Sequence, residues 1–158
     1  MIEYPKRFYE FIEEETKREM KLNKRDSNIS RQDLIDWSKE LNMNKKYLSK
    51  EDIIKSILES GQSYLDFFNR FNNKAYGIHP SRFSNKFKIN NYQRHKMQEQ
   101  GFIKMLYIKE EEIYPTRFEK VPYYDPVRYF SISQNDIEEW KSVNIKGYIN
   151  KNQCSLFD

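Results

Sequence analysis

The chain has 158 residues and a formal net charge of +4 at pH 7; 33% of its residues are charged and 37% are hydrophobic. No run of about 18 apolar residues occurs, so the sequence predicts no membrane-spanning helix, and its first residues lack the apolar stretch of a signal peptide. Cys154 is the only cysteine, which excludes an internal disulfide and fits a reducing cytoplasm. One Cys and two His also argue against structural zinc, and we expect neither a metal nor another cofactor.

The first half of the chain shows the apolar spacing of four helices, predicted over 4–22, 31–41, 50–60 and 62–73. Ser30 and Ser49 are the expected N-caps of the second and third helices, because each is followed three residues later by an aspartate. Gly61 is expected to end the third helix.

The second half mixes short helices with strands. Helices are predicted from Pro80 to Lys86, over 89–100, and after an N-cap at Ser133 or Asn135. Residues 102–108 form the best strand candidate, with 113–121 and 127–132 as its expected partners. The predicted fold class is therefore α+β and mostly helical, with a small antiparallel sheet.

Positive charge is concentrated in residues 70–109, which contain nine Lys/Arg and one acid, Glu99. This segment carries +8, and the remaining 118 residues carry −4. Aromatic and amide side chains lie between the charges, a composition that favours contact with nucleic acid. The alternative is a solvated face whose balancing acids come from elsewhere in the fold.

Residues 30–59 contain two helical patterns joined by an extended link. The apolar and basic positions that define the pattern are Leu34, Trp37, Leu41, Lys50, Ile53, Ile54 and Ile57. This string resembles the SAP and Rho-N-terminal type of helix–extended–helix module, but the usual glycine of the link is absent. The resemblance implies phosphate contacts by Lys45, Lys46 and Lys50 beside a helix N-terminus. A packed helical hairpin with exposed lysines is the alternative.

Residues 64–132 follow the order helix, short helix, turn, helix ending in Gly-Phe-Ile, and strands. The string SRFSNKFKINNYQRHKMQEQGFIKM resembles a winged helix-turn-helix domain. The resemblance implies that the helix after residue 89 reads bases, with Lys86 and Lys88 on the backbone and a wing formed by the strand region. The predicted DNA-contacting residues are Arg82, Lys86, Lys88, Asn90, Asn91, Gln93, Arg94, Lys96, Lys104 and Lys109.

This string departs from the winged-helix pattern at one position. Gln93 and Arg94 stand one turn before Met97, where the family has an apolar residue. Either Tyr92 fills that role by a shifted register, or the helix is misplaced. An unrelated α+β arrangement is the alternative fold for this region.

The chain ends in Gln-Cys-Ser-Leu-Phe-Asp, which resembles the bacterial sliding-clamp-binding motif. The matching residues are Gln153, Ser155, Leu156 and Phe157, and Cys154 replaces the usual leucine. Such motifs bind as short peptides whose Leu and Phe fill an apolar pocket on the ring-shaped clamp. The alternative is that these residues fold back on the domain, or that the match is accidental.

Together these patterns predict three regions: a SAP-like helical module over 1–61, a winged-helix-like DNA-binding domain over 62–143, and a flexible tail over 144–158. The predicted function is non-enzymatic DNA binding in replication, regulation or host takeover by a phage, plasmid or other mobile element, with the tail on a sliding clamp. One alternative is an inhibitor that docks on a host replication or defence protein. A small metal-dependent nuclease is the third hypothesis, although neither histidine lies in a catalytic motif and no P-loop is present.

Overall fold

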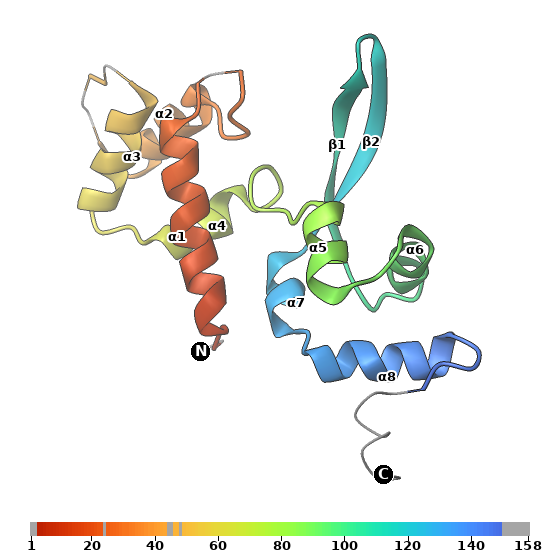
Figure 1. The fold of residues 1–158 in the computed structure, drawn as a ribbon. Helices are drawn as coiled ribbons and strands as arrows, with labels where there is room; N and C mark the ends of the chain where they lie inside the picture. Colours follow the sequence, from red (N-terminus) through yellow and green to blue (C-terminus); the bar gives the residue numbers. More distant parts are fainter. Residues whose placement is uncertain (1–2, 24, 44–45, 48, 150–158) are drawn as a thin grey trace. The chain divides into compact units, whose positions relative to one another are not determined.

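The computed structural model describes residues 3–23, 25–43, 46–47 and 49–149, and the chain divides into two compact units, Met1–Gly77 and Ile78–Asp158. In this described part, eight helices accompany one two-stranded antiparallel sheet (Figure 1), so the α+β, mostly helical fold class is confirmed. None of these helices combines the length and the apolar character needed to cross a bilayer.

Unit 1 (Met1–Gly77) contains four helices: α1 (Lys6–Lys21), α2 (Arg31–Glu40), α3 (Lys50–Glu59) and α4 (Tyr64–Phe71). The predicted N-caps at Ser30 and Ser49 are confirmed, because their hydroxyls accept backbone N–H groups of Asp33 and Asp52 at 3.1 and 3.2 Å. Ser63 caps α4 in the same way. Each cap satisfies one of the N–H groups that a helix leaves unpaired in its first turn.

Aromatic side chains form the core of unit 1. Phe8 of α1 meets Phe68 of α4 edge to face, with ring centroids 5.2 Å apart. Trp37 of α2 meets Phe67 of α4 at 4.8 Å. Aromatic pairs of this geometry contribute about 0.5–1.5 kcal/mol beyond the burial of their area. These contacts make α4 an integral part of unit 1.

The boundary between the units lies at Gly77, later in the chain than the predicted boundary at residue 61. The buried phenylalanines of α4 need an apolar partner, and α1 and α2 supply it. After α4, the hydroxyl of buried Tyr76 forms a hydrogen bond with Thr16 of α1 at 2.8 Å. Burial raises the pKa of Tyr76, so the phenol stays neutral in this bond.

Unit 2 (Ile78–Asp158) contains α5 (Pro80–Phe87), α6 (Asn91–Glu99), β1 (Met105–Tyr114), β2 (Arg117–Tyr124), α7 (Pro126–Ser131) and α8 (Gln134–Asn144). Pro80 is the first residue of α5, as predicted. Ser133, rather than Asn135, caps α8 by accepting the N–H of Asp136 at 3.1 Å.

Strands β1 and β2 form a long hairpin that projects beyond the helices of unit 2 (Figure 1). β1 begins at Met105, three residues later than predicted, and continues through the acidic residues 110–112 to Tyr114. These acids are tolerated in a strand because the ribbon is largely exposed and water solvates them. At its base, Tyr124 pairs with Ile78 in an isolated antiparallel bridge, so the residues that lead into α5 meet the end of β2.

The prediction of a strand over 127–132 is wrong, because Pro126–Ser131 forms helix α7. The aromatic and β-branched residues there favour a strand, but the local start signals favour a helix. Asp125 accepts the N–H of Val127 at 2.9 Å, and proline occupies the first helical position.

The core of unit 2 joins α5, β2 and α7. The Phe83 ring lies 4.9 Å from that of Phe87, 5.5 Å from that of Tyr124 and 5.9 Å from that of Tyr129. Fully or almost fully buried apolar side chains complete this core: Ile78, Ile89, Met97, Ile103, Ile132 and Ile137. The arrangement fixes α5, α6 and the base of the hairpin as one scaffold.

Candidate nucleic-acid interface

Helices α5 and α6 are joined by a tight turn over residues 88–90. Lys88 ends α5 in the left-handed conformation with φ of 52°, and Ile89 is buried. Asn90 and Gln93 form a reciprocal capping box: the Asn90 side chain accepts the N–H of Gln93 at 2.8 Å, and the Gln93 side chain accepts the N–H of Asn90 at 3.0 Å. These two predicted base-reading side chains therefore hold the start of α6.

One face of α6 is exposed and polar. Asn91, Tyr92 and His95 lie on it, and the side chain of Tyr92 is 73% exposed. Met97, fully buried, marks the opposite face. Glu99, in the last turn, is the first acid on the exposed face. The first two turns of α6 thus offer an amide, a phenol and an imidazole to solvent.

Arg94 occupies the position where the winged-helix pattern has an apolar residue, and it is only 8% exposed. Tyr92 does not take that position, because its side chain is 73% exposed. The Arg94 guanidinium donates to Tyr124 Oη at 3.2 Å, to Ser84 Oγ at 3.3 Å and to Asn91 Oδ1 at 2.8 Å. Burial raises the pKa of Tyr124, and the bond from Arg94 opposes that shift.

Several other predicted contact residues of unit 2 also bond internally. Lys86 Nζ lies 4.1 Å from the centroid of the Tyr129 ring and donates to the Tyr129 carbonyl at 3.3 Å. Arg82 is exposed, with its guanidinium 5.6 Å from the same ring. Lys96 Nζ reaches the carbonyl of Asn144 at 3.5 Å. Cations placed over aromatic faces lose mobility but keep their charge.

Lys88 and Lys104 are the predicted lysines of unit 2 with exposed side chains. Lys88 precedes α6 in the chain and Lys104 follows it. Lys109 is half-buried on β1. Exposed lysines at such positions suit a phosphate backbone better than a base edge.

The predicted lysines of unit 1 differ from one another in their surroundings. Lys50 is 11% exposed and pairs at 3.1 Å with Glu19, which is itself 1% exposed. Burial lowers the pKa of Lys50, and the charge of Glu19 opposes that shift. Lys46 is exposed, and Lys45 lies outside the described residues. Lys50 therefore joins α3 to α1 instead of facing solvent.

The first two basic residues of the +8 segment also belong to unit 1, and both form ion pairs with carboxylates. Arg70 donates two hydrogen bonds to Glu40 at 2.6 and 2.7 Å, and Lys74 contacts Asp33 at 2.9 Å. The basic segment 70–109 is consequently divided between two units, and its charges in unit 1 are balanced locally.

The hairpin differs from a basic wing. Its largest exposed apolar side chains are Ile108, Ile113, Tyr114 and Phe118, with 45–63% of each exposed. Arg117 pairs with Glu119 at 3.5 Å. Glu111 of β1 accepts from the Tyr123 hydroxyl and lies 3.4 Å from the imidazole of His79. The hairpin is therefore mixed in charge and apolar near its tip.

The sequence analysis did not single out His95 or Tyr92 as contact residues. The signal was present, because His95 follows Asn91 by four residues and so shares its helical face. Fixing the register of the helix on buried Met97 would have placed both on the exposed side and Arg94 on the buried side.

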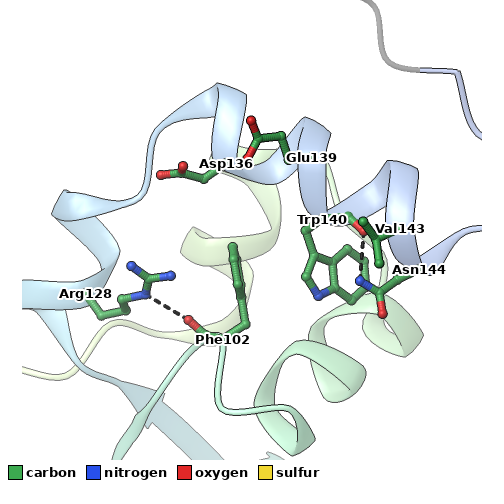
Figure 2. Close-up of a pocket in the computed structure, with 7 residues that line it drawn as sticks. All are labelled: Phe102, Arg128, Asp136, Glu139, Trp140, Val143 and Asn144. Carbon is green, nitrogen blue, oxygen red and sulfur yellow. Dashed lines mark hydrogen bonds between the residues drawn. The ribbon is translucent and has the colours of Figure 1, made fainter.

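A separate pocket of 340 Å³ lies between α8 and the segment after α6, and Figure 2 shows its lining. Arg128 donates to the carbonyl of Phe102 at 2.8 Å and lies 4.9 Å from the centroid of its ring. Trp140 donates to Gln100 at 2.7 Å, and Asn144 donates to the carbonyl of Trp140 at 2.9 Å. Because these polar groups already bond within the unit, we assign this pocket a packing role.

The predicted clamp-binding residues Gln153, Ser155, Leu156 and Phe157 lie outside the described residues. Within residues 3–149, apart from the few positions not described, no group of three His, Asp or Glu side chains could hold a metal ion. Comparisons of the chain with protein-family models, with curated proteins and with solved structures found no match.

Proposed function

We propose that unit 2 binds DNA and that α6 enters the groove. The observation that carries this proposal is the exposed polar face of α6, formed by Asn91, Tyr92 and His95, with the exposed lysines Lys88 and Lys104 before and after the helix in the chain. An α-helix of about 10–12 Å diameter fits the major groove of B-DNA, which is about 12 Å wide. An Asn amide there can bond the edge of adenine, while lysines beside it contact phosphates.

The order of the elements supports the same proposal. Two helices joined by a tight turn precede an antiparallel hairpin, and Ile78, two residues before the first helix, bridges to the end of the second strand. This order resembles a winged helix-turn-helix domain, although α4, the first helix of the predicted domain, packs in unit 1. In that arrangement α6 is the helix presented to DNA.

The wider role inferred from the sequence is non-catalytic and cytoplasmic: a replication, regulatory or host-takeover factor of a mobile element. Its tether to a sliding clamp would depend on Gln153–Phe157. A calorimetric titration of the C-terminal peptide against a bacterial clamp tests this part alone, and absence of heat would remove it without affecting the proposal for α6.

The test for DNA binding is a fluorescence titration of a mixed-sequence duplex at about 50 and 200 mM salt, where phosphate-based affinity falls steeply with salt. Tyr92→Ala/His95→Ala removes two exposed side chains of α6 and should weaken binding about tenfold or more. Tyr9→Ala, at a 44% exposed tyrosine of unit 1, is the matched control and should bind like wild type. Absence of wild-type binding, or equal affinity of the α6 variant, would refute the proposal.

The apolar hairpin favours a second candidate function, docking on another protein. Exposed Tyr114 and Phe118 near its tip are the kind of aromatic anchors that dominate protein interfaces. A protein partner would bind with weaker salt dependence than DNA does, and Tyr114→Ser/Phe118→Ser would abolish its binding while leaving DNA affinity unchanged.

A further inference from the structure

A groove of 690 Å³ lies within unit 2 between the helices α5 and α6 on one side and the hairpin on the other. Its helical wall includes Ser81, Asn85 and His95, and its hairpin wall includes Lys120 and Val121. Arg94 also lines the groove, from the buried face of α6. The groove therefore combines hydroxyl, amide and imidazole groups, an exposed lysine, one buried guanidinium and the two acids Glu111 and Glu119.

The hydrogen bonds of Arg94 leave part of its guanidinium without a partner. Nε donates to Tyr124, and the two N–H groups of Nη1 face Ser84 and Asn91. Nη2 has no acceptor among the described residues. The one fully buried side-chain N or O without a partner in the described part is the hydroxyl of Tyr47, so Nη2 keeps access to solvent. Because Arg94 is one of the residues that line the groove, we infer that Nη2 opens onto it.

All three partners of Arg94 are neutral. None of the ion pairs found between described residues includes it, although its side chain is more than nine-tenths buried. A buried charge is costly without an opposite charge, and a guanidinium cannot relieve that cost by losing its proton. An anion in the groove would supply the missing partner.

We propose that this groove binds one phosphate group, held by Nη2 of Arg94 at the base and by donors of both walls. A tetrahedral anion needs donors from several directions, which Ser81, His95 and Lys120 provide around the guanidinium. Two acids also line the hairpin wall, but each already has partners: Glu111 has His79 and Tyr123, and Glu119 has Arg117.

This inference is separate from the proposed reading of DNA by α6, because its central residue, Arg94, is buried and is not part of the exposed face. His95 belongs to both the exposed face and the groove. The phosphate could belong to a nucleic-acid backbone or to a free phosphate compound. Both sources present the same oxyanion to the same donors, so the experiment must separate them.

The test uses two-dimensional NMR of the full chain titrated with inorganic phosphate, against sodium chloride at equal ionic strength. We expect saturable shifts of the amides around Ser84, Asn91 and His95 and of the Arg94 Nε–H signal with phosphate only. Lys120→Gln, at an exposed groove residue, should weaken phosphate binding about threefold or more, since a cation near an anion contributes modestly in water. Lys39→Gln, at an exposed lysine of unit 1, is the matched control and should change nothing.

A second titration with a short duplex identifies the source. If the duplex shifts the same groove signals and competes with phosphate, the bound group is a backbone phosphate. If phosphate shifts them and the duplex does not, the groove takes a free phosphate compound. The phosphate site would be refuted if phosphate shifted the groove signals no more than chloride does and the duplex did not shift them either. DNA binding by α6 would still be tested separately by the α6 variants.

Discussion

The basic residues of the two units differ in the kind of group that they contact. In unit 1, several lysines and arginines pair with carboxylates, as in Lys50–Glu19, Arg70–Glu40 and Lys74–Asp33, although Arg31 donates to the carbonyl of Tyr47. In unit 2, bases on the helices bond neutral oxygens: Arg94 bonds Tyr124, Ser84 and Asn91, and Lys96 reaches a backbone carbonyl. Charge that is balanced inside the protein stabilises the fold, whereas charge left with neutral partners remains available to attract an external anion.

The contrast also shows why a run of basic residues in sequence is a poor guide to a basic surface. The +8 segment crosses the boundary at Gly77, and its first two bases belong to the unit with balanced charges.

The largest effect is expected at the buried ion pair of unit 1. Lys50→Ala leaves Glu19, 1% exposed, without its cation, and loss of one partner of a buried pair costs about 3–5 kcal/mol. Lys55→Ala breaks an exposed pair with Glu51 and should cost less than about 1 kcal/mol. Denaturant unfolding monitored by Trp37 fluorescence in a Trp140→Phe background measures both variants. Equal losses would show that the pair of Lys50 is not buried in solution.

DNA affinity should separate the two halves of the +8 segment. Lys88→Gln/Lys104→Gln removes two exposed charges of unit 2 and should lower the slope of log affinity against log salt by about 2. Arg70→Gln/Lys74→Gln removes the same charge from unit 1 and should leave the slope unchanged, because those bases already face Glu40 and Asp33. A similar decrease of the slope in both variants would mean that basic residues along the whole segment contact DNA.

Removing the apolar tip of the hairpin should hardly change stability. Tyr114→Ser and Phe118→Ser affect side chains that are 63% and 61% exposed, so each should lie within about 0.5 kcal/mol of wild type. Tyr124→Ala, at a 1% exposed residue of the same hairpin, should cost about 3–5 kcal/mol by analogy with other large buried aromatics. Thermal unfolding of the three variants checks this; a strongly destabilised tip variant would place the tip in a packed environment.

Much of the fold could be predicted because its signals are local. Serines and asparagines before apolar periods marked the starts of α2, α3, α6 and α8, and Pro80 marked α5. The prediction of a strand over 127–132 was wrong because it gave more weight to the β-branched and aromatic residues of this segment than to its helix-start signals. Those signals are the N-cap Asp125 and the proline at the first helical position, Pro126. The assignment of α4 depended on which neighbour covers its phenylalanines, and local sequence does not contain that information.

The candidate interface was predicted less well than the fold. Composition located the basic segment, but only the register of α6 shows that Asn91 and His95 face solvent while Arg94 is buried. Gln93 looked like a base reader, yet its side chain completes a capping box. Polar side chains serve caps, internal networks and ligands equally well, and tertiary contacts decide among these roles.

The smallest expected effect concerns acid pH and sharpens the comparison within unit 1. At Asp33 burial acts to raise the pKa, but hydrogen bonds from Lys74 and from Ser30 outweigh it and hold the pKa below the ordinary value of 3.8. The unfolded carboxyl therefore binds its proton at a higher pH than the folded one. The stabilising contribution of Asp33 is complete above the unfolded pKa and is lost as pH falls through the folded value.

Because Asp33 is partly solvated, this contribution should be below about 1 kcal/mol. Trp140→Phe leaves Trp37 as the only tryptophan, so its fluorescence reports the unfolding of unit 1 alone. Between pH 5 and pH 3, Lys74→Gln in this background should lose less stability than its parent, since the bond from Lys74 is a main reason for the lowered pKa. Parallel losses in parent and variant would mean that Lys74 is not paired with Asp33 in solution, and balanced charge would then no longer distinguish this part of unit 1 from unit 2.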